Sequence, residues 1–296
     1  IEYSFFFQKK TTVLMVLNRM MIARIICVLL CFFSFGFHAA AAPLNVRGAI
    51  LMDLDSVKVL YKQNENKKIP PASLTKIMTM YLVFDAIKAK KISLDTKVKV
   101  SRKAACTGGS SMHLKKGDIV TVKQLLYGMA VASGNDACVA IAEHMAGSEK
   151  KFVRLMNEKA RRLKMNHTVF KTCNGLPAKG QYTTANDMLA LSRNYIMTHP
   201  ECLTYHNTKQ YAYRDYVLRN KNPLLGRYQG ADGLKTGWTR ASGYNIVSTV
   251  RRGGTRLLAV ILGANTDTIR AKELKKLMDA GFAVKSHKVT KISKAL

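Results

Sequence analysis

Segments with the pattern of β-strands lie at both ends of this 296-residue chain, and segments with the pattern of helices lie between them. Near the start, VRGAILMDLDSVKVLYKQN has short apolar runs on either side of a polar Asp-Ser turn, as a β-hairpin has. Near the end, YNIVSTVRRGGTRLLAVILGA indicates two β-branched strands joined by a Gly-Gly turn. This order predicts an α+β fold in which helices cover an antiparallel sheet and the first and last strands pair.

Apolar residues recur at helical spacing through the middle of the chain. Their spacing predicts mostly buried helices in VKQLLYGMAVAS and DACVAIAEHMAG, and amphipathic helices in KKFVRLMNEKARRLKM and TTANDMLALSRNYIM. Thr184 and Asp187 are placed as a capping pair for the last of these. TIRAKELKKLMDAGF predicts a closing helix that ends at Gly281.

Residues 19–42 have the composition of an export signal. Two arginines precede an apolar run from Ile25 to Phe37, and small residues that suit a cleavage site follow it. We therefore expect residues 1–42 to be a leader, cleaved near Ala42, and the mature protein to be periplasmic or otherwise extracytoplasmic. An uncleaved anchor is the alternative, although the apolar run is shorter than the ~20 residues that cross a bilayer.

The chain carries a formal net charge of +30. Only four basic residues and one acidic residue lie within residues 1–42, so the charge belongs to the expected mature protein. Such a charge would ordinarily indicate nucleic acid as a partner. Outside the cytoplasm the anionic partners are instead lipid headgroups, wall polymers and substrate carboxylates. We expect no nucleic-acid partner, and either an electrostatic contact with membrane or wall or a basic surface without a specific partner.

Four cysteines lie beyond the expected leader, at spacings that match no zinc-binding motif. We therefore expect no metal. In an oxidising compartment one or two disulfides could form, but buried free thiols fit the sequence equally well. These cysteines are Cys106, Cys138, Cys173 and Cys202.

Ser73 and Lys76 follow a pair of prolines in IPPASLTKIMTM. At positions i and i+3 of a helix, the two side chains lie on one face within reach of each other. The apolar run that follows would bury Lys76, and burial lowers the pKa of a lysine toward values at which it can accept a proton. A second such pair, Ser148 and Lys151, introduces a charged amphipathic helix, so we expect it to be a surface coincidence.

Two further motifs follow Ser73 in the chain. The triplet SGN at 133–135 stands 60 residues after Ser73, between two apolar helices, where a serine side chain can project from a loop. The triplet KTG at 235–237 follows 102 residues after Ser133, in a strand-like stretch. SRN at 192–194 also fits S-x-N, but it lies in mid-helix, where its hydroxyl is expected to bond to its own backbone.

With S-x-x-K, S-x-N and K-T-G in this order, the chain resembles the penicillin-binding and serine β-lactamase superfamily. From about residue 47 to residue 282 it is similar to the low-molecular-mass D-alanyl-D-alanine carboxypeptidases, as SGNDACVAIAEHMAGSEKKFVRLMN, GQYTTANDMLAL and DGLKTGWTRASGYN show. The resemblance implies a five-stranded antiparallel sheet flanked by helices, a helical subdomain and no cofactor. It places a catalytic domain at residues 43–282 and leaves residues 283–296 as a short basic tail without a second domain.

The resemblance implies a catalytic role for three residues. Ser73 would be acylated by the penultimate D-alanine of a peptidoglycan pentapeptide, with Lys76 as its base. Ser133 would pass the proton to the leaving D-alanine, which requires a hydroxyl that both donates and accepts.

The resemblance implies that six other residues bind the substrate. Asn135 would bind the substrate amide and hold Lys76 in place. Lys235 would supply a cation and Thr236 a hydroxyl for the terminal carboxylate, and Arg270 would lie near that carboxylate. Gly237 would let the substrate approach the strand, and Trp238 would supply a backbone N–H of the oxyanion hole. A packing aromatic and a solvated charge are the simpler interpretations of Trp238 and Arg270.

The expected activity is that of a serine peptidase, a hydrolase that removes terminal D-alanine from peptidoglycan stem peptides and is covalently inhibited by penicillin and other β-lactams. An endopeptidase that cuts D-alanine cross-links uses the same motifs and is the alternative. A β-lactamase is less favoured, because the E-x-x-L-N motif that activates water in class A enzymes does not occur in the sequence. A catalytically inactive wall-binding protein is disfavoured because every motif residue is present.

Overall fold

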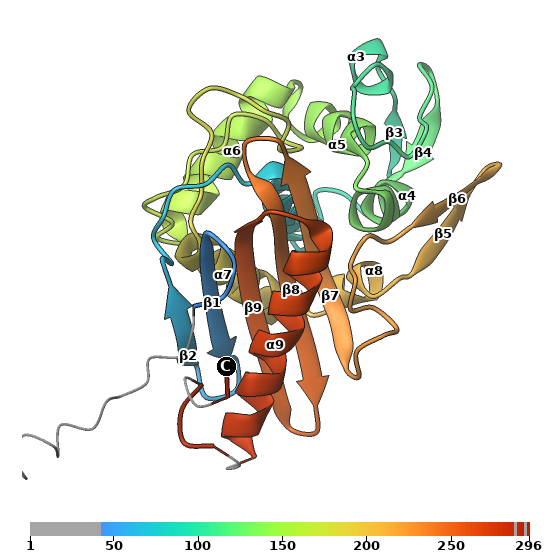
Figure 1. Ribbon diagram of the computed structural model, residues 1–296. Coiled ribbons are helices and arrows are strands. Elements are labelled where there is room, and N and C mark those ends of the chain that lie inside the picture. Colours follow the sequence, from blue (N-terminus) through green and yellow to red (C-terminus); the bar gives the residue numbers. More distant parts are fainter. Residues whose placement is uncertain (1–42, 287–288, 293–294) are drawn as a thin grey trace, which may run out of the picture. The chain divides into compact units, whose positions relative to one another are not determined.

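The computed structural model describes residues 43–286, 289–292 and 295–296 (Figure 1). The predicted leader, with its export signal and its cleavage site near Ala42, lies outside the described residues. In the part of the chain that is described, no helix combines the length and the apolar character needed to cross a membrane.

A five-stranded antiparallel sheet with strand order β2-β1-β9-β8-β7 forms the framework of the fold (Figure 1). Both predicted hairpins are present, and Leu51 of the first strand pairs with Ala259 of the last. The predicted sheet and its pairing of first and last strands are therefore confirmed. The strands are β1 Gly48–Asp53, β2 Lys58–Gln63, β7 Ala231–Thr239, β8 Gly243–Arg252 and β9 Thr255–Ala264.

Helices cover both faces of the sheet. Successive side chains of a strand point to opposite faces, so each strand contributes apolar residues to both layers. In β9, Leu257, Ala259 and Ile261 pack with the C-terminal helix α9 (Asp267–Lys285). The alternate residues Leu258 and Val260 belong to a larger core that contains the long helices on the other face. This double burial explains why β9 has a nearly continuous apolar sequence.

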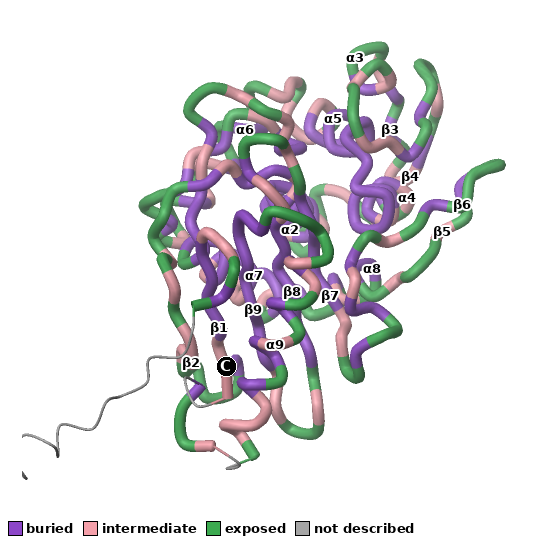
Figure 2. Tube along the Cα trace, in the orientation of Figure 1, coloured by how far each residue is buried: buried purple, intermediate pink, exposed green. Residues whose placement is uncertain are grey.

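The remaining helices lie between β2 and β7 in the chain, as the sequence predicts. A short 3₁₀ turn, η1 (Ala72–Leu74), leads into α2 (Thr75–Lys88), which is buried along most of its length (Figure 2). The others are α3 Arg102–Ala105, α4 Val122–Tyr127, the π-helical turn η2 Gly128–Ala132, α5 Asn135–Ala146, α6 Glu149–Arg162, α7 Ala185–Thr198 and α8 Cys202–His206. The predicted cap of α7 is present, since Thr184 Oγ1 accepts a hydrogen bond from the amide of Asp187.

Two small hairpins accompany the helices and were not anticipated from the sequence. One pairs β3 (Lys97–Lys99) with β4 (Ile119–Thr121), and the other pairs β5 (Gln210–Tyr213) with β6 (Tyr216–Arg219). Each strand is too short for an alternating pattern to distinguish it from a loop.

Helix α9 continues through Gly281 to Lys285, so the predicted end at Gly281 is wrong. A Cβ added to Gly281 would lie 2.7 Å from Leu51 Cδ2 and 2.8 Å from Leu257 Cδ1. The glycine therefore lets the helix lie close against the sheet and does not end it.

None of the four cysteines within the described ranges forms a disulfide. Cys138, Cys173 and Cys202 are buried and Cys106 is exposed, so buried free thiols account for three of the four. Among the same residues, no three His, Cys, Asp or Glu side chains are arranged to hold a metal ion.

Candidate active site

Ser73 lies in η1, where the chain turns sharply before it enters α2. Ala72, immediately before it, has a φ of +49°, in the left-handed region that a non-glycine residue adopts at a cost. A Cβ on Gly175 would overlap the carbonyl oxygen of Ala72, so the loop around Gly175 packs directly on this turn. The strained turn that presents the Ser73 hydroxyl is therefore held from outside by a neighbouring loop.

Lys76 lies one helical turn after Ser73, and its side chain is fully buried. Its Nζ is 3.0 Å from Ser73 Oγ, 2.7 Å from Asn135 Oδ1 and 2.7 Å from the carbonyl oxygen of Asn174. Burial lowers the pKa of Lys76 below its ordinary value. A neutral amine has two N–H groups and one lone pair. The two carbonyl-type oxygens can take both N–H groups, which leaves the lone pair to accept the Ser73 hydroxyl proton.

The SGN triplet lies at the junction of η2 and α5. Ser133 has a φ of +60°, and its buried hydroxyl has no hydrogen-bond partner among the described residues. Asn135 contacts Lys76 through Oδ1, and its Nδ2 donates to the carbonyl of Gly108 at 2.7 Å. A Cβ on Gly134 would lie 2.8 Å from Asp136 Oδ1, so this backbone has little space for a side chain at the middle position.

The KTG triplet lies on β7, directly against the turn that carries Ser73. A Cβ on Gly237 would be 2.9 Å from the backbone nitrogen of Ser73 and 3.1 Å from that of Leu74. Strand and turn therefore meet backbone to backbone. The next residue, Trp238, leaves 56% of its surface exposed, and its ring centroid lies 5.8 Å from that of Tyr244. Its indole ring therefore lies at the protein surface beside Tyr244.

Lys235 is buried, and its Nζ donates to the carbonyl of Thr236 at 3.1 Å. Burial and the charge of Lys76 lower the pKa of Lys235 well below its usual value. The backbone just before Lys235 is fixed by side chains, since His206 Nδ1 lies 3.0 Å from the carbonyl oxygen of Leu234. Strand β7 thus holds a second buried lysine near enough to Lys76 for the two charges to interact.

Arg270 lies in the first turns of α9 and is only 7% exposed, so its interpretation as a solvated charge is wrong. Its guanidinium lies 5.7 Å from the ring centroid of Tyr244, and its Nε has no partner among the described residues. Arg270 is also close enough to Lys235 for its charge to contribute, after burial and the two neighbouring lysines, to lowering the pKa of Lys235. The structure therefore brings Arg270 to the same region as the KTG strand.

Two contributions to the site have no motif that could reveal them. One is the backbone carbonyl of Asn174, which any residue type could supply. The other is Lys221, whose charge lowers the pKa values of Lys76 and Lys235 in addition to burial. Lys221 Nζ lies 3.3 Å from Ser110 Oγ, on the segment whose carbonyl groups hold Asn135. Only the fold brings these residues together.

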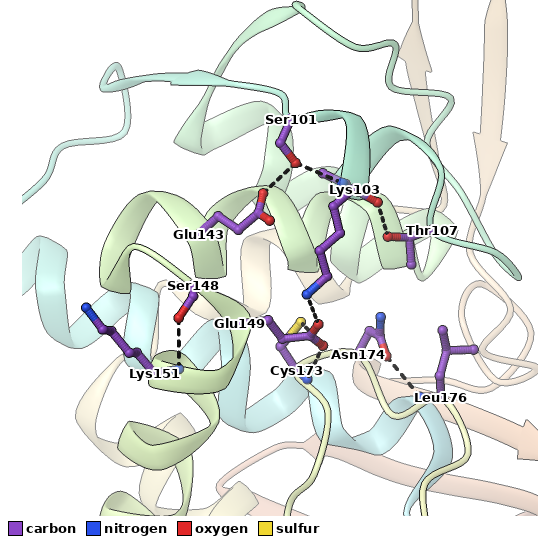
Figure 3. Close-up of polar contacts among 11 residues, drawn as sticks. Ser101, Lys103, Thr107, Glu143, Ser148, Glu149, Lys151, Cys173, Asn174 and Leu176 are labelled. Atoms are coloured by element: carbon purple, nitrogen blue, oxygen red, sulfur yellow. Dashed lines mark hydrogen bonds and ion pairs between the residues drawn. The ribbon is translucent and has the colours of Figure 1, made fainter.

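The competing pair Ser148–Lys151 is a helix cap (Figure 3). Ser148 Oγ accepts a hydrogen bond from the backbone amide of Lys151 at 3.2 Å, in an exposed position. The expectation of a surface coincidence is confirmed.

The competing triplet SRN lies in the middle of α7, as predicted. The Ser192 hydroxyl is buried but has no hydrogen-bond partner in the described part of the chain. The expectation that it bonds to its own backbone is therefore wrong, because the hydroxyl is packed in the core without an acceptor within bonding geometry.

The family model described as "Peptidase_S11: D-alanyl-D-alanine carboxypeptidase" matches residues 36–266. Among curated proteins, the chain is 45% identical over 249 residues to D-alanyl-D-alanine carboxypeptidase DacC of Escherichia coli K12, covering 82% of this chain and 62% of the relative. It is 40% identical over 250 residues to DacF of Bacillus subtilis 168, covering 81% and 62%. The chain thus spans less than two thirds of the length of these relatives.

Solved structures show the same similarity. Penicillin binding protein 6B from Escherichia coli superposes with a TM-score of 0.78 and 38% identity, covering 82% of this chain and 79% of that one. Penicillin-Binding Protein D2 from Listeria monocytogenes, in its ampicillin-bound form, has a TM-score of 0.75 and 33% identity, covering 81% and 98%.

Proposed function

The chain belongs to the S11 peptidase family of D-alanyl-D-alanine carboxypeptidases, and we propose that it is a serine D,D-carboxypeptidase that removes the terminal D-alanine of peptidoglycan pentapeptides. One observation carries the proposal. A fully buried lysine amine lies 3.0 Å from Ser73 Oγ, while Asn135 and Asn174 offer acceptors for its N–H groups. This arrangement suits a neutral amine acting as a base.

In the proposed acylation, Lys76 takes the Ser73 proton as Oγ attacks the carbonyl carbon of the penultimate D-alanine. The C–N bond to the terminal D-alanine then breaks, and the leaving amine needs a proton. The Ser133 hydroxyl, buried and without a partner, can donate its own proton to that amine and recover one from Lys76. Water then hydrolyses the ester and regenerates Ser73.

The second lysine and its neighbours suit the terminal carboxylate of the substrate. We propose that Lys235 and Thr236 bind this group, with Arg270 adding positive charge nearby. Lys76 and Lys235 each have a lowered pKa, and both cannot readily stay protonated when buried so close together. A bound substrate carboxylate would pair with protonated Lys235 and raise its pKa, so Lys76 is the lysine that gives up its proton.

The meeting of β7 with η1 suits an oxyanion hole. We propose that the backbone N–H groups of Ser73 and Trp238 stabilise the negative oxygen that develops during attack. Gly237 makes this possible because its missing side chain lets the two backbone segments touch. Asn135, held by the Gly108 carbonyl, would bind the amide of the substrate.

We further propose that residues 43–282 form the catalytic domain and that residues 1–42 are an export signal cleaved near Ala42. The enzyme would then work outside the cytoplasm, where peptidoglycan lies. The formal net charge of +30 favours electrostatic contact with anionic membrane or wall.

A labelled penicillin tests the proposed nucleophile. It should form a stable adduct on Ser73, which Ser73→Ala abolishes and Ser148→Ala does not. An adduct that persists in Ser73→Ala would refute the assignment.

Purified wall peptides test the reaction. A pentapeptide should lose a single D-alanine, detected by mass spectrometry. Cleavage of cross-linked peptides without release of terminal D-alanine would instead support the endopeptidase.

A further inference from the structure

Glu149, in the first turn of α6, lies between α3 and the loop segment that contacts Lys76 (Figure 3). Its Oε2 is 2.8 Å from Lys103 Nζ, and its side chain is only 17% exposed. Its Oε1 accepts hydrogen bonds from the backbone nitrogen of Cys173 at 3.3 Å and from the thiol of Cys173 at 3.4 Å. One carboxylate therefore joins three parts of the chain.

The carboxylate is ionised at neutral pH. Burial acts to raise the pKa of Glu149, but the hydrogen bonds from Lys103 and from the Cys173 amide and thiol outweigh burial and lower it. An ionised acceptor makes stronger hydrogen bonds than a neutral one.

The segment that Glu149 holds is fixed on its other side by α2. Thr79 Oγ1 donates to the carbonyl of Cys173 at 2.5 Å, and Thr79 lies close to Lys76 on that helix. The carbonyl of the next residue, Asn174, accepts from Lys76 Nζ at 2.7 Å. Both polar groups of the Cys173 backbone are thus held by side chains, immediately before the carbonyl that orients the amine.

We propose that Glu149 is a positioning residue for the proposed acylation, because it fixes the Cys173–Asn174 segment and thereby directs the lone pair of Lys76 toward Ser73. This inference rests on the proposed function. If the Asn174 carbonyl moved, one N–H of the neutral amine would lose its acceptor, and the amine could rotate its lone pair away from the hydroxyl. Glu149 acts only through this segment.

Glu143, on α5, provides a matched control in the same region (Figure 3). Its Oε2 accepts from Ser101 Oγ at 2.6 Å, so it also links a helix to the start of α3. Its hydrogen bond does not reach the Cys173–Asn174 segment. Substitution of Glu143 therefore disturbs the contact between α5 and the start of α3 without the proposed positioning effect.

Substitution by Met and Gln separates the two properties of Glu149. Met has a similar length but only a weak acceptor in its thioether sulfur, whereas Gln keeps an amide oxygen as acceptor for the Cys173 amide and lacks the charge. We expect Glu149→Met to slow acylation by labelled penicillin by about 10- to 100-fold, the range for a misplaced catalytic group. The Kd of the peptide before acylation should stay within about twofold, because the carboxylate site is untouched.

Glu149→Gln should retain most of the acylation rate, and Glu143→Met should match the wild type. Rates are referred to the amount of protein that finally takes the label, so that misfolded molecules do not count. Hydrogen exchange at the amides of Cys173 to Gly175 should be faster in Glu149→Met and unchanged in Glu143→Met.

Three results would overturn the inference. They are wild-type acylation in Glu149→Met, equal losses in the two Met variants, and unchanged exchange at residues 173–175. A wild-type protein that takes no label would refute the proposed function itself, and the exchange measurement would still decide whether Glu149 fixes this segment.

Discussion

Replacing Gly237 by Ala tests the contact between β7 and the turn that carries Ser73. The added Cβ would lie 2.9 Å from the Ser73 nitrogen, 3.1 Å from the Leu74 nitrogen and 3.2 Å from Ala72 Cβ. All three are backbone atoms or a Cβ, so no flexible side chain can move aside. Reaching an ordinary contact distance of at least 3.4 Å requires strand and turn to separate by about 0.5 Å at the closest point.

A separation of this size disturbs both proposed donors of the oxyanion hole. A 1 Å misplacement can cost roughly 10²-fold in rate, and loss of one oxyanion donor roughly 10²- to 10³-fold. We therefore expect Gly237→Ala to slow acylation about 10- to 100-fold, or about 1.4–2.7 kcal/mol in activation free energy. Overpacking should also lower the free energy of unfolding by about 1–3 kcal/mol.

The assay is the rate of labelling by a fluorescent penicillin, with thermal unfolding of the same samples. Gly254→Ala is the control, because a Cβ there meets no atom within 4 Å, and it should label at the wild-type rate. A folded Gly237→Ala protein that labels as fast as the wild type would show that the backbone contact plays no part in acylation.

Four other substitutions test separate parts of the site and fold. Lys76→Arg should abolish acylation, because a guanidinium cannot give up its proton, whereas Lys235→Arg keeps a cation and should retain measurable turnover; equal losses would refute the division of roles. The acylation rate should rise with pH as Lys76 loses its proton. Because the Lys221 charge lowers the pKa of Lys76, Lys221→Met should move this rise to higher pH in stopped-flow labelling. A shift to lower pH would contradict this. Gly281→Leu should lower the free energy of unfolding by about 1–3 kcal/mol in urea titrations, because the added side chain would collide with Leu51 and Leu257. The acylation rate per folded molecule should not change. An unchanged free energy of unfolding would show that the helix does not lie against these two residues.

The parts of the fold that the sequence predicts are those with a strong periodic or turn signal. The Gly-Gly turn between β8 and β9 and the apolar runs of α2 and α5 fall in this class. The prediction that the helix ends at Gly281 is wrong. A glycine that follows apolar residues at helical spacing gives the same sequence pattern whether it ends the helix or lets the helix pack closely on a sheet. Only the positions of Leu51 and Leu257 distinguish these cases.

The site divides in the same way. Ser73, Lys76 and the SGN and KTG triplets could be proposed from the sequence because their proposed chemistry depends on side-chain type and spacing. The Asn174 carbonyl belongs to the backbone, and the proposed role of Glu149 depends on which loop lies beside it. Such contributions arise from tertiary contacts between segments far apart in the chain, and no local pattern records them.

The pairing of β1 with β9 has a consequence for how the protein reaches its native state. A hairpin such as β1–β2 is at best marginally stable alone, and its inner edge stays unpaired until β9 arrives. Contacts between distant parts of a chain form slowly, because loop-closure entropy opposes them. During that time Ile50 and Leu51, fully buried in the native sheet, are open to wrong partners, including the same strand of another copy. The protein is therefore most prone to aggregate during folding, before the sheet is complete, and the duration of this stage depends on how soon β9 pairs with β1.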